Sequence, residues 1–364
     1  MQVKTQPFVS VLILNYNGED YLANCIQSVL KSPYPNFEVL LVDNASTDDS
    51  LNNAQQAFGA DPRLRIVKNH ANLGFSGGNN AGLPHCRGEY IVFLNNDTAV
   101  EPEWLSALVE AMQSDPTIGL AQSLILMMDS ERIQIGGWLF SNYLVRKQAL
   151  GNIMHSKTQF TSVFEVSVAS GACMIVKRAL LDEIGLFDST IPFFYDDTLL
   201  SLKVWLAGKR VVTVPNSRIR HILGATSSWN VESTTFNLLR AKICLIFDVY
   251  YRLDELARAA LVNFLNTLMN SLFAIKWGQI PVISANIHGL AWGLSNLKYL
   301  WRNRRIRWSK SKISHDQLKR NFIRVNVPVP LYLVPSKLSE DYFILEVNKL
   351  EKAVIQAQFP RVIS

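Results

Sequence analysis

Residues 90–97, YIVFLNND, decide the fold of this chain. Tyr90 to Leu94 form an apolar run that suits a β-strand buried on both faces. Asp97 follows at the point where this strand ends in a loop. Ligands of open α/β sheets bind beyond the carboxyl ends of the strands, so Asp97 is a candidate ligand of a hard cation such as Mg²⁺ or Mn²⁺. The same residues also suit a turn or a helix cap, and this segment alone leaves both interpretations open.

Two earlier segments repeat this layout of an apolar strand followed by polar residues. Residues 8–14, FVSVLIL, precede Asn15-Tyr16-Asn17, and residues 37–42, FEVLLV, precede Asp43. Strands alternate with segments of helical spacing, which predicts a βαβ arrangement around a mainly parallel sheet. The other predicted elements are helices over 21–30 and 103–112 and a strand over 64–67.

The common phosphate-binding loops are missing, because the chain has no G-x-x-x-x-G-K-[ST] and no G-x-G-x-x-G after its first strand. Residues 72–80, NLGFSGGNN, are glycine-rich and include Asn72 and Asn79. Their backbone could approach a ligand closely, or the segment could be a loop that leads into a helix. A nucleotide bound without a phosphate loop needs a cation for its diphosphate, which strengthens the case for Asp97.

Six segments in order resemble the family 2 glycosyltransferases of the GT-A fold, especially the bacterial branch that includes rhamnosyltransferases of surface-polysaccharide assembly. The resemblance extends from about residue 9 to about residue 228. It rests on VSVLILNYNGEDYLANCIQSVL, FEVLLVDNASTDDS, NLGFSGGNNAG, GEYIVFLNNDTAVEPEWL, SGACMIVKRALLDEIGLFD and FFYDDTLLSLKVWLAGKRVVTVPNSRIRH. The resemblance implies a nucleotide-diphosphate sugar as donor, a saccharide or lipid-linked acceptor, and a divalent cation (Mg²⁺ or Mn²⁺) as cofactor.

The resemblance also implies roles for individual residues. Asp43 would contact the nucleotide base, and Asp97 would bind the cation with His221 near it. Asp197 would be the catalytic base, with Asp196 assisting it. To the nucleotide site we also assign the polar residues at the strand ends and in the glycine-rich segment, which are Asn15, Tyr16, Asn17, Asn72, Asn79 and Asn95.

The chain departs from the family pattern at three positions. Asn95 replaces the first acid of the D-x-D element, Asp196 replaces the Glu of the E-D-x-D element, and Leu199 replaces its last acid. The loss of a carboxylate at Leu199 bears on how the acceptor is handled. A catalytically inactive relative that binds a nucleotide sugar therefore stays an alternative. A sugar nucleotidyltransferase is a second alternative, although the glycine-rich start usual in that class is missing.

The reaction explains why these residue types are needed. A divalent cation neutralises the charge that develops on the leaving diphosphate. A carboxylate on the other side takes the proton of the incoming hydroxyl, an effect of about 10²–10⁴-fold, and a single displacement inverts the anomeric configuration. Asp196 beside Asp197 is a like-charge pair, which tends to raise one pKa. The pair would also suit the N-cap of a helix over 199–206, and both roles can coexist.

The net charge of +6 is concentrated in residues 302–320, which hold eight Lys or Arg and one Asp. Two apolar stretches precede them, over 259–275 and 283–301, and polar interruptions argue against spanning helices. Amphipathic helices in a membrane interface fit better, with basic residues drawn to anionic lipid. A helical cap packed on the catalytic domain is the alternative. Asparagines at helical spacing mark the first stretch, and tryptophans are the expected interfacial anchors: Asn263, Asn266 and Asn270, and Trp277, Trp292, Trp301 and Trp308.

We therefore expect a GT-A catalytic domain over 1–235, an amphipathic membrane-associating helical region over 236–320, and a tail over 321–364 with a helix over 339–358. The four cysteines are far apart and form no C-x-x-C, which argues against zinc and disulfides and favours a reducing compartment. The first apolar run is too short for a signal peptide. The expected location is the cytoplasm, peripheral on the inner face of the cell membrane. No recognition motif supports nucleic acid as a partner of the basic cluster.

Overall fold

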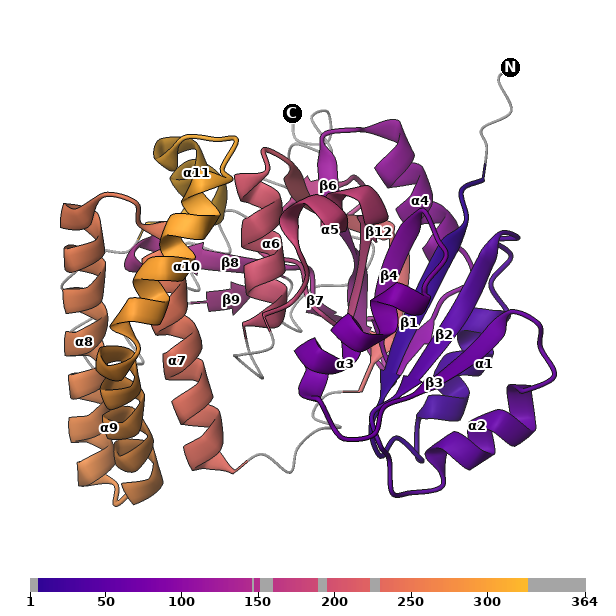
Figure 1. Ribbon diagram of the computed structural model, residues 1–364, viewed down its shortest axis with the longest axis horizontal. Coiled ribbons are helices and arrows are strands. Elements are labelled where there is room, and N and C mark those ends of the chain that lie inside the picture. The colour runs from indigo at the N-terminus through magenta and orange to yellow at the C-terminus, as the bar shows by residue number, and fades with distance from the viewer. Residues whose placement is uncertain (1–5, 146, 151–159, 189–194, 223–229, 327–364) are drawn as a thin grey trace, which may run out of the picture.

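The computed structural model describes residues 6–145, 147–150, 160–188, 195–222 and 230–326. A curled sheet with helices on both faces lies beside a group of long helices (Figure 1). The order of the sheet strands is β10-β12-β6-β11-β4-β1-β2-β3, with β5 and β7 pairing onto β12 and β6. Their bounds are β1 Val9–Asn15, β2 Phe37–Asp43, β3 Leu64–Lys68, β4 Tyr90–Asn95, β5 Thr98–Val100, β6 Ile118–Met127, β7 Ile133–Ile135, β10 Phe164–Glu165, β11 Cys173–Lys177 and β12 Arg210–His221.

The core of the sheet is parallel, as the alternation of strands and helices predicts. β1 pairs in parallel with β2 and β4, β2 with β3, and β6 with β12, while β11 runs antiparallel between β4 and β6. Asn15 at the end of β1 is in register with Asp43 at the end of β2. The carboxyl ends of the parallel strands therefore meet at one edge.

The strand β4 is buried on both faces, which confirms the interpretation of residues 90–94. Ile91 and Phe93 belong to the hydrophobic core on one face of the sheet, and Val92 and Leu94 to the core on the other face. Side chains alternate across a strand, so an unbroken apolar run fills both layers. The covering helices are α1 Leu22–Leu30, α2 Ser50–Phe58, α3 Gly74–Gly82, α4 Trp104–Ser114, α5 Arg178–Ile184 and α6 Asp196–Leu206, with a 3₁₀ turn η1 at Leu83–His85.

The glycine-rich segment forms helix α3, and two of its glycines serve packing rather than ligand contact. A Cβ atom at Gly78 would lie 2.5 Å from Leu14 Cδ1, and one at Gly82 would lie 2.6 Å from Val42 Cγ2. Glycine at these positions lets α3 lie directly on β1 and β2. Residues 72–80 are therefore a loop that leads into a helix, as one of the two interpretations held.

The C-terminal helices pack against one another, and the chain returns at their end to the second, smaller sheet. Strand β13 pairs in parallel with β8, and Phe322 stacks on Phe140 with ring centroids 5.2 Å apart. The predicted helix over 339–358 lies outside the described residues. The remaining bounds are α7 Val231–Val249, α8 Leu253–Lys276, α9 Ile280–Ser295, α10 Leu297–Ser309 and α11 His315–Phe322, and in the second sheet β8 Trp138–Ser141, β9 Lys147–Ala149 and β13 Ile323–Val325, with a 3₁₀ turn η2 at Asn142–Leu144.

The basic cluster is only partly a surface feature, so its assignment to lipid was wrong for two arginines. Arg304 is buried, and its guanidinium donates to the carbonyl groups of Tyr250 and Tyr251 just after α7. Such contacts satisfy carbonyl groups that a helix end leaves without partners. Arg307 Nη1 lies 2.5 Å from Asp248 Oδ1, and Asp248 is buried. These two arginines hold the fold together, whereas Arg302 and Arg305 are exposed.

Two of the three asparagines of the stripe on α8 face the interior, the reverse of an ordinary surface helix, whereas Asn270 is exposed. Asn263 and Asn266 are buried, and Asn263 Nδ2 donates to Tyr143 O. The outward face of α8 is apolar, with exposed fractions of 45% at Leu268 and 51% at Leu272. Among the tryptophans, Trp277 and Trp301 are exposed, whereas Trp292 and Trp308 are partly buried.

None of the described helices combines the length and the apolar character that a bilayer-spanning segment needs. This agrees with the expectation drawn from the polar interruptions in residues 259–301. All four cysteines are buried and free of disulfide bonds.

Candidate active site

A cavity of about 460 Å³ opens beyond the carboxyl ends of β1, β2 and β4. Its position follows from the parallel arrangement, because each of these strands delivers its terminal loop to the same edge. The chain brings seven of the predicted site residues to its walls: Tyr16, Asn72, Asn95, Asp97, Asp196, Asp197 and His221.

Asp97 and His221 form one side of this cavity. His221, the last residue of β12, places its Nε2 atom 3.2 Å from Asp97 Oδ1, and its Nδ1 atom lies 2.8 Å from Gln134 Oε1. When Nδ1 donates its hydrogen to Gln134, Nε2 presents a lone pair to the carboxylate. Asp97 Oδ1 is buried and has no hydrogen bond within the described part of the chain.

Two acceptors that face each other at this distance suit a shared cation. Carboxylate oxygens are preferred ligands of Mg²⁺ and Mn²⁺. A histidine ligand usually donates a hydrogen bond from the N–H of its second ring nitrogen to a neighbouring oxygen. The described residues include no group of three or more His, Cys, Asp or Glu that could hold a metal ion. Asp97 and His221 could give a cation two ligands, and its other ligands would have to come from substrate or water.

The carboxylates Asp196 and Asp197 lie in the first turn of α6. Ser76 of α3 donates a hydrogen bond to Asp196. Burial, followed by the neighbouring Asp197 charge, raises the pKa of Asp196 to about 8. At neutral pH Asp196 therefore keeps its proton, and the negative charge of the pair belongs to Asp197.

Lys147 stands beside the charged member of the pair. Its Nζ atom lies 3.9 Å from Asp197 Oδ1 and 3.4 Å from Thr198 Oγ1. The ring of Trp138 holds the same ammonium group 4.5 Å from its centroid. A cation over an aromatic face is stabilised there. Trp138 therefore helps to hold the positive charge of Lys147 near the N-terminus of α6.

Four other predicted residues lie outside the cavity walls. Asn15 Nδ2 donates to Asp43 Oδ1 at 3.2 Å, and Asp43 also accepts from Ser46 Oγ at 2.6 Å. Asn17 Oδ1 accepts from the backbone of Thr47. These contacts tie the loops after β1 and β2 together. The remaining residue, Asn79, is buried within α3 and donates to Phe75 O.

The sequence interpretation missed several residues of the cavity and its supports. Ser76 and Lys147 reach the carboxylate pair from distant positions in the chain, and no motif spacing marks them. Asn96 Nδ2 donates to Asn15 Oδ1 at 2.7 Å, and Asn44 Nδ2 donates to Asn72 Oδ1 at 2.8 Å. Both Asn44 and Asn96 could have been proposed. Each is the second polar residue after a predicted strand.

A family model supports the interpretation of the first half of the chain. Residues 10–185 match the model described as glycosyl transferase family 2. The O-antigen biosynthesis protein RfbC of Myxococcus xanthus is 30% identical over 228 residues, which cover 60% of this chain and 18% of RfbC. The matched part thus spans well under half of that relative.

Two solved structures share the fold. GalNAc-T7, described in complex with UDP, GalNAc and Mn²⁺, gives a TM-score of 0.57 at 18% identity and covers 73% of this chain and 51% of its own. The mannosyltransferase PcManGT from Pyrobaculum calidifontis, described in complex with GDP-Man and Mn²⁺, gives 0.51 at 18% identity and covers 84% and 86%. At such identities the likeness concerns the fold, and the predicted GT-A fold is confirmed.

Proposed function

We propose that this chain transfers a sugar from a nucleotide-diphosphate donor to a saccharide acceptor in cell-surface polysaccharide synthesis, because its residues 10–185 match the model of glycosyl transferase family 2. The observation that carries the proposal is that Asp97, Asp196 and Asp197 line one cavity beyond the strand ends. Displacement of a diphosphate needs compensation of its charge and acceptance of a proton within one site. The similarity to RfbC, an O-antigen biosynthesis protein, supports the polysaccharide assignment.

We assign the donor diphosphate to the side of the cavity that holds Asp97 and His221. These residues would hold a divalent cation, as their facing acceptor atoms suit one. Bound there, the cation would supply positive charge to the leaving diphosphate. The Mn²⁺ described for GalNAc-T7 and PcManGT supports this assignment. Tyr16, Asn72 and Asn95 stay our candidates for nucleotide contact, and Asp43 stays our candidate for contact with the base. Asn15 and Asn17 would fix the loops around the nucleotide, and Asn79 would act only through the packing of α3.

Asp197 acts as the base in this proposal. The acceptor hydroxyl oxygen forms a bond to the anomeric carbon, the bond from that carbon to the diphosphate oxygen breaks, and the hydroxyl proton passes to Asp197. A single displacement of this kind inverts the anomeric configuration. Asp196 keeps its own proton near neutral pH and accepts a hydrogen bond from Ser76. Its role is therefore to position Asp197, not to accept the proton of the acceptor.

The test is a donor-binding screen by calorimetry across nucleotide sugars, with and without Mn²⁺. We expect one donor class to bind much more tightly with Mn²⁺, and Asp97→Ala to remove that metal dependence. Transfer to a saccharide acceptor is then measured with the donor that binds. Unchanged metal dependence in Asp97→Ala would refute the cation site. Tight binding without any turnover would identify an inactive nucleotide-sugar-binding relative instead.

We further propose that the helical region holds the chain on an anionic membrane surface. The support is the outward apolar face of α8 and the exposed basic residues Arg302 and Arg305 of α10. Apolar side chains and basic residues on one region are the signature of an interfacial helix. Attachment of this kind would give the chain access to a lipid-linked saccharide as acceptor.

A further inference from the structure

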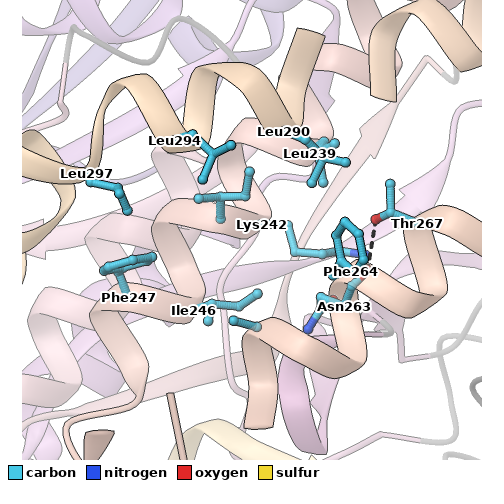
Figure 2. Close-up of a pocket in the computed structure, with 13 residues that line it drawn as sticks. Leu239, Lys242, Ile246, Phe247, Asn263, Phe264, Thr267, Leu290, Leu294 and Leu297 are labelled. Atoms are coloured by element: carbon cyan, nitrogen blue, oxygen red, sulfur yellow. Dashed lines mark hydrogen bonds between the residues drawn. The ribbon is translucent and has the colours of Figure 1, made fainter. Parts of the chain in front are cut away.

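A pocket of about 310 Å³ lies between α7, α8 and α9, away from the candidate active site. Figure 2 shows Leu290, Leu294 and Leu297 on one side, Ile246 and Phe247 of α7 on another, and Phe264 of α8 reaching in from a third. This volume lies at the lower end of the range of about 300–1,000 Å³ usual for small-molecule sites. The pocket therefore has room for one narrow ligand.

Glycines of α9 shape the pocket. A Cβ atom at Gly289 would lie 2.7 Å from Leu239 Cδ2, and one at Gly293 would lie 3.0 Å from Ile243 Cδ1. The absence of side chains lets α9 press closely on α7, and Gly293 itself lines the pocket. The closely packed α7 and α9 therefore bound the pocket on two sides, and α8 forms its third side.

The polar groups of the lining are mostly engaged by the protein. Lys242 Nζ donates to Val145 O at 3.3 Å, and Thr267 Oγ1 donates to Asn263 O at 2.9 Å. Asn263 Nδ2 donates to Tyr143 O, while its Oδ1 atom has no hydrogen bond among the described residues. The surface that remains is apolar, so the pocket favours a hydrocarbon ligand.

The rim of the pocket continues into the apolar outer face of α8 and α9. Phe264, Leu294 and Leu297 line the pocket and are 47%, 72% and 41% exposed. Other exposed apolar side chains of these helices extend the surface: Leu261, Leu268, Leu272, Ile275, Trp277, Ile280 and Ile287. The exposed apolar residues at the rim give a hydrocarbon chain an entry to the pocket.

The stretch that follows the first turn of α8 and runs through α9 and α10 carries positive charge. Residues 256–315 contain no Asp or Glu and nine Lys or Arg. Lys298, which is exposed, directly follows Leu297 of the rim. An apolar chain with an anionic head group is the ligand that complements such a surrounding.

We propose that this pocket binds the hydrocarbon chain of the phosphate-bearing lipid that carries the acceptor saccharide. The inference rests on the proposed function, which supplies the acceptor. Its chain would lie among the leucines and phenylalanines, and its phosphate would lie toward the exposed basic residues of α10, which are Lys298, Arg302 and Arg305. The helical region is then a substrate-binding part of the enzyme as well as a membrane anchor.

The direct test is calorimetric titration of the full chain with dodecyl phosphate, below the concentration at which it forms micelles. We expect one binding site, and no measurable binding of butyl phosphate or inorganic phosphate. Ala260→Trp fills the pocket from its exposed rim and should weaken binding at least tenfold. Ala257→Trp, on an exposed position of α8 outside the pocket, is the matched control and should stay within twofold. Leu294→Gln, a second rim variant, should also weaken binding.

Two outcomes of the titration would overturn the proposal. Equal binding by Ala260→Trp and Ala257→Trp would mean adsorption to the outer face. No binding by the unmodified chain would mean another occupant, such as residues 327–364 or a second copy of the chain.

An activity measurement separates this inference from the proposed function. Transfer is compared for one saccharide carried on a long-chain and on a short-chain phosphate. Ala260→Trp should remove the preference for the long chain while donor binding and transfer to the short-chain acceptor stay unchanged. Retention of that preference, with loss of vesicle binding instead, would assign the pocket to bilayer lipid and refute the acceptor site. Absence of transfer from every variant and the unmodified chain would refute the proposed function itself.

Discussion

Asp196 shows how the environment of a single residue decides its role. Burial and the adjacent Asp197 raise its pKa to about 8, so it is protonated over most of the range in which enzymes work. Asp197 is then the anionic partner, beside Lys147 at 3.9 Å. Sequence alone pointed to the pair, but the division of labour within it depends on burial, which the sequence does not give.

The raised pKa predicts a dependence of stability on pH. In the unfolded chain Asp196 loses its proton near pH 3.8, whereas in the folded chain it does so near 8. Between these values the unfolded state binds fewer protons, so the free energy of unfolding falls by about 1.4 kcal/mol per pH unit from this group. The contribution is complete below about pH 4 and lost as the pH rises through about 8.

Asp196→Asn removes this titration. We expect the variant to gain stability relative to the unmodified chain as the pH is raised from about 5 to about 8.5. Urea unfolding of both proteins at each pH measures the difference, in which the titrating groups that do not interact with Asp196 cancel. A difference that stays constant over this range would show that Asp196 titrates normally in the folded chain.

At the scale of secondary-structure elements, Arg307 tests how α10 is held to α7. It connects α10 to the buried Asp248 of α7, and Tyr195, the N-cap of α6, donates a hydrogen bond to the same carboxylate. Removing one partner of a buried pair costs about 3–5 kcal/mol, because the other charge stays buried alone. Arg307→Gln should therefore lower the free energy of unfolding by about that amount.

Arg305→Gln is the matched control, because Arg305 lies on the same helix and is exposed. Its expected effect is within about 0.5 kcal/mol. Urea unfolding at one pH compares the two variants. Equal, small effects would mean that Arg307 is not engaged with Asp248 and that this pair does not hold α10 to α7.

The elements that the sequence predicts well are those with local signals. The strand at residues 90–95 was recognised because its apolar run needs no knowledge of its neighbours. The second sheet was missed, since β8 and β9 are short and β13 joins them from far along the chain. The orientation of α8 was also beyond reach: periodicity identifies a polar face, but not whether Asn263 and Asn266 meet water or the bundle.

The same limit applies to the basic window at residues 302–320. A run of arginines looks alike whether it faces solvent or carboxylates, and Asp248, the partner of Arg307, lies 59 residues away. The same limit applies to the residues of the candidate active site. Asp97, Asp196, Asp197 and His221 could be proposed from motifs, whereas Ser76 and Lys147 reach the carboxylate pair only through the folded topology.

At the scale of the whole molecule, the outward apolar face of α8 predicts attachment to membranes. Leu268 and Leu272 are about half exposed, and burying a leucine side chain fully is worth about 1.5–3 kcal/mol. Replacing both by glutamine should weaken binding to vesicles of phosphatidylglycerol and phosphatidylcholine by about tenfold or more. Sedimentation with vesicles gives the bound fraction.

Val163→Gln is the control for this experiment, because Val163 is 41% exposed and lies outside the helical region. It should leave vesicle binding unchanged. High salt should weaken binding only in part, since it screens the exposed arginines and leaves the apolar face. If the leucine variants bind vesicles normally, the helical region is a cap on the catalytic domain and not a membrane anchor.

The central claim is that the cavity beyond the strand ends transfers a sugar with Asp197 as base, and Asp197→Asn tests it most directly. Asparagine keeps the shape of the side chain but cannot accept a proton. Donor affinity by calorimetry and the transfer rate are measured on the same preparation, with Asp196→Asn as the neighbouring control. The account predicts unchanged donor affinity and a rate lower by about 10²-fold or more in Asp197→Asn, with a smaller loss in Asp196→Asn. Near-normal turnover in Asp197→Asn would contradict it, because the proton would then go elsewhere.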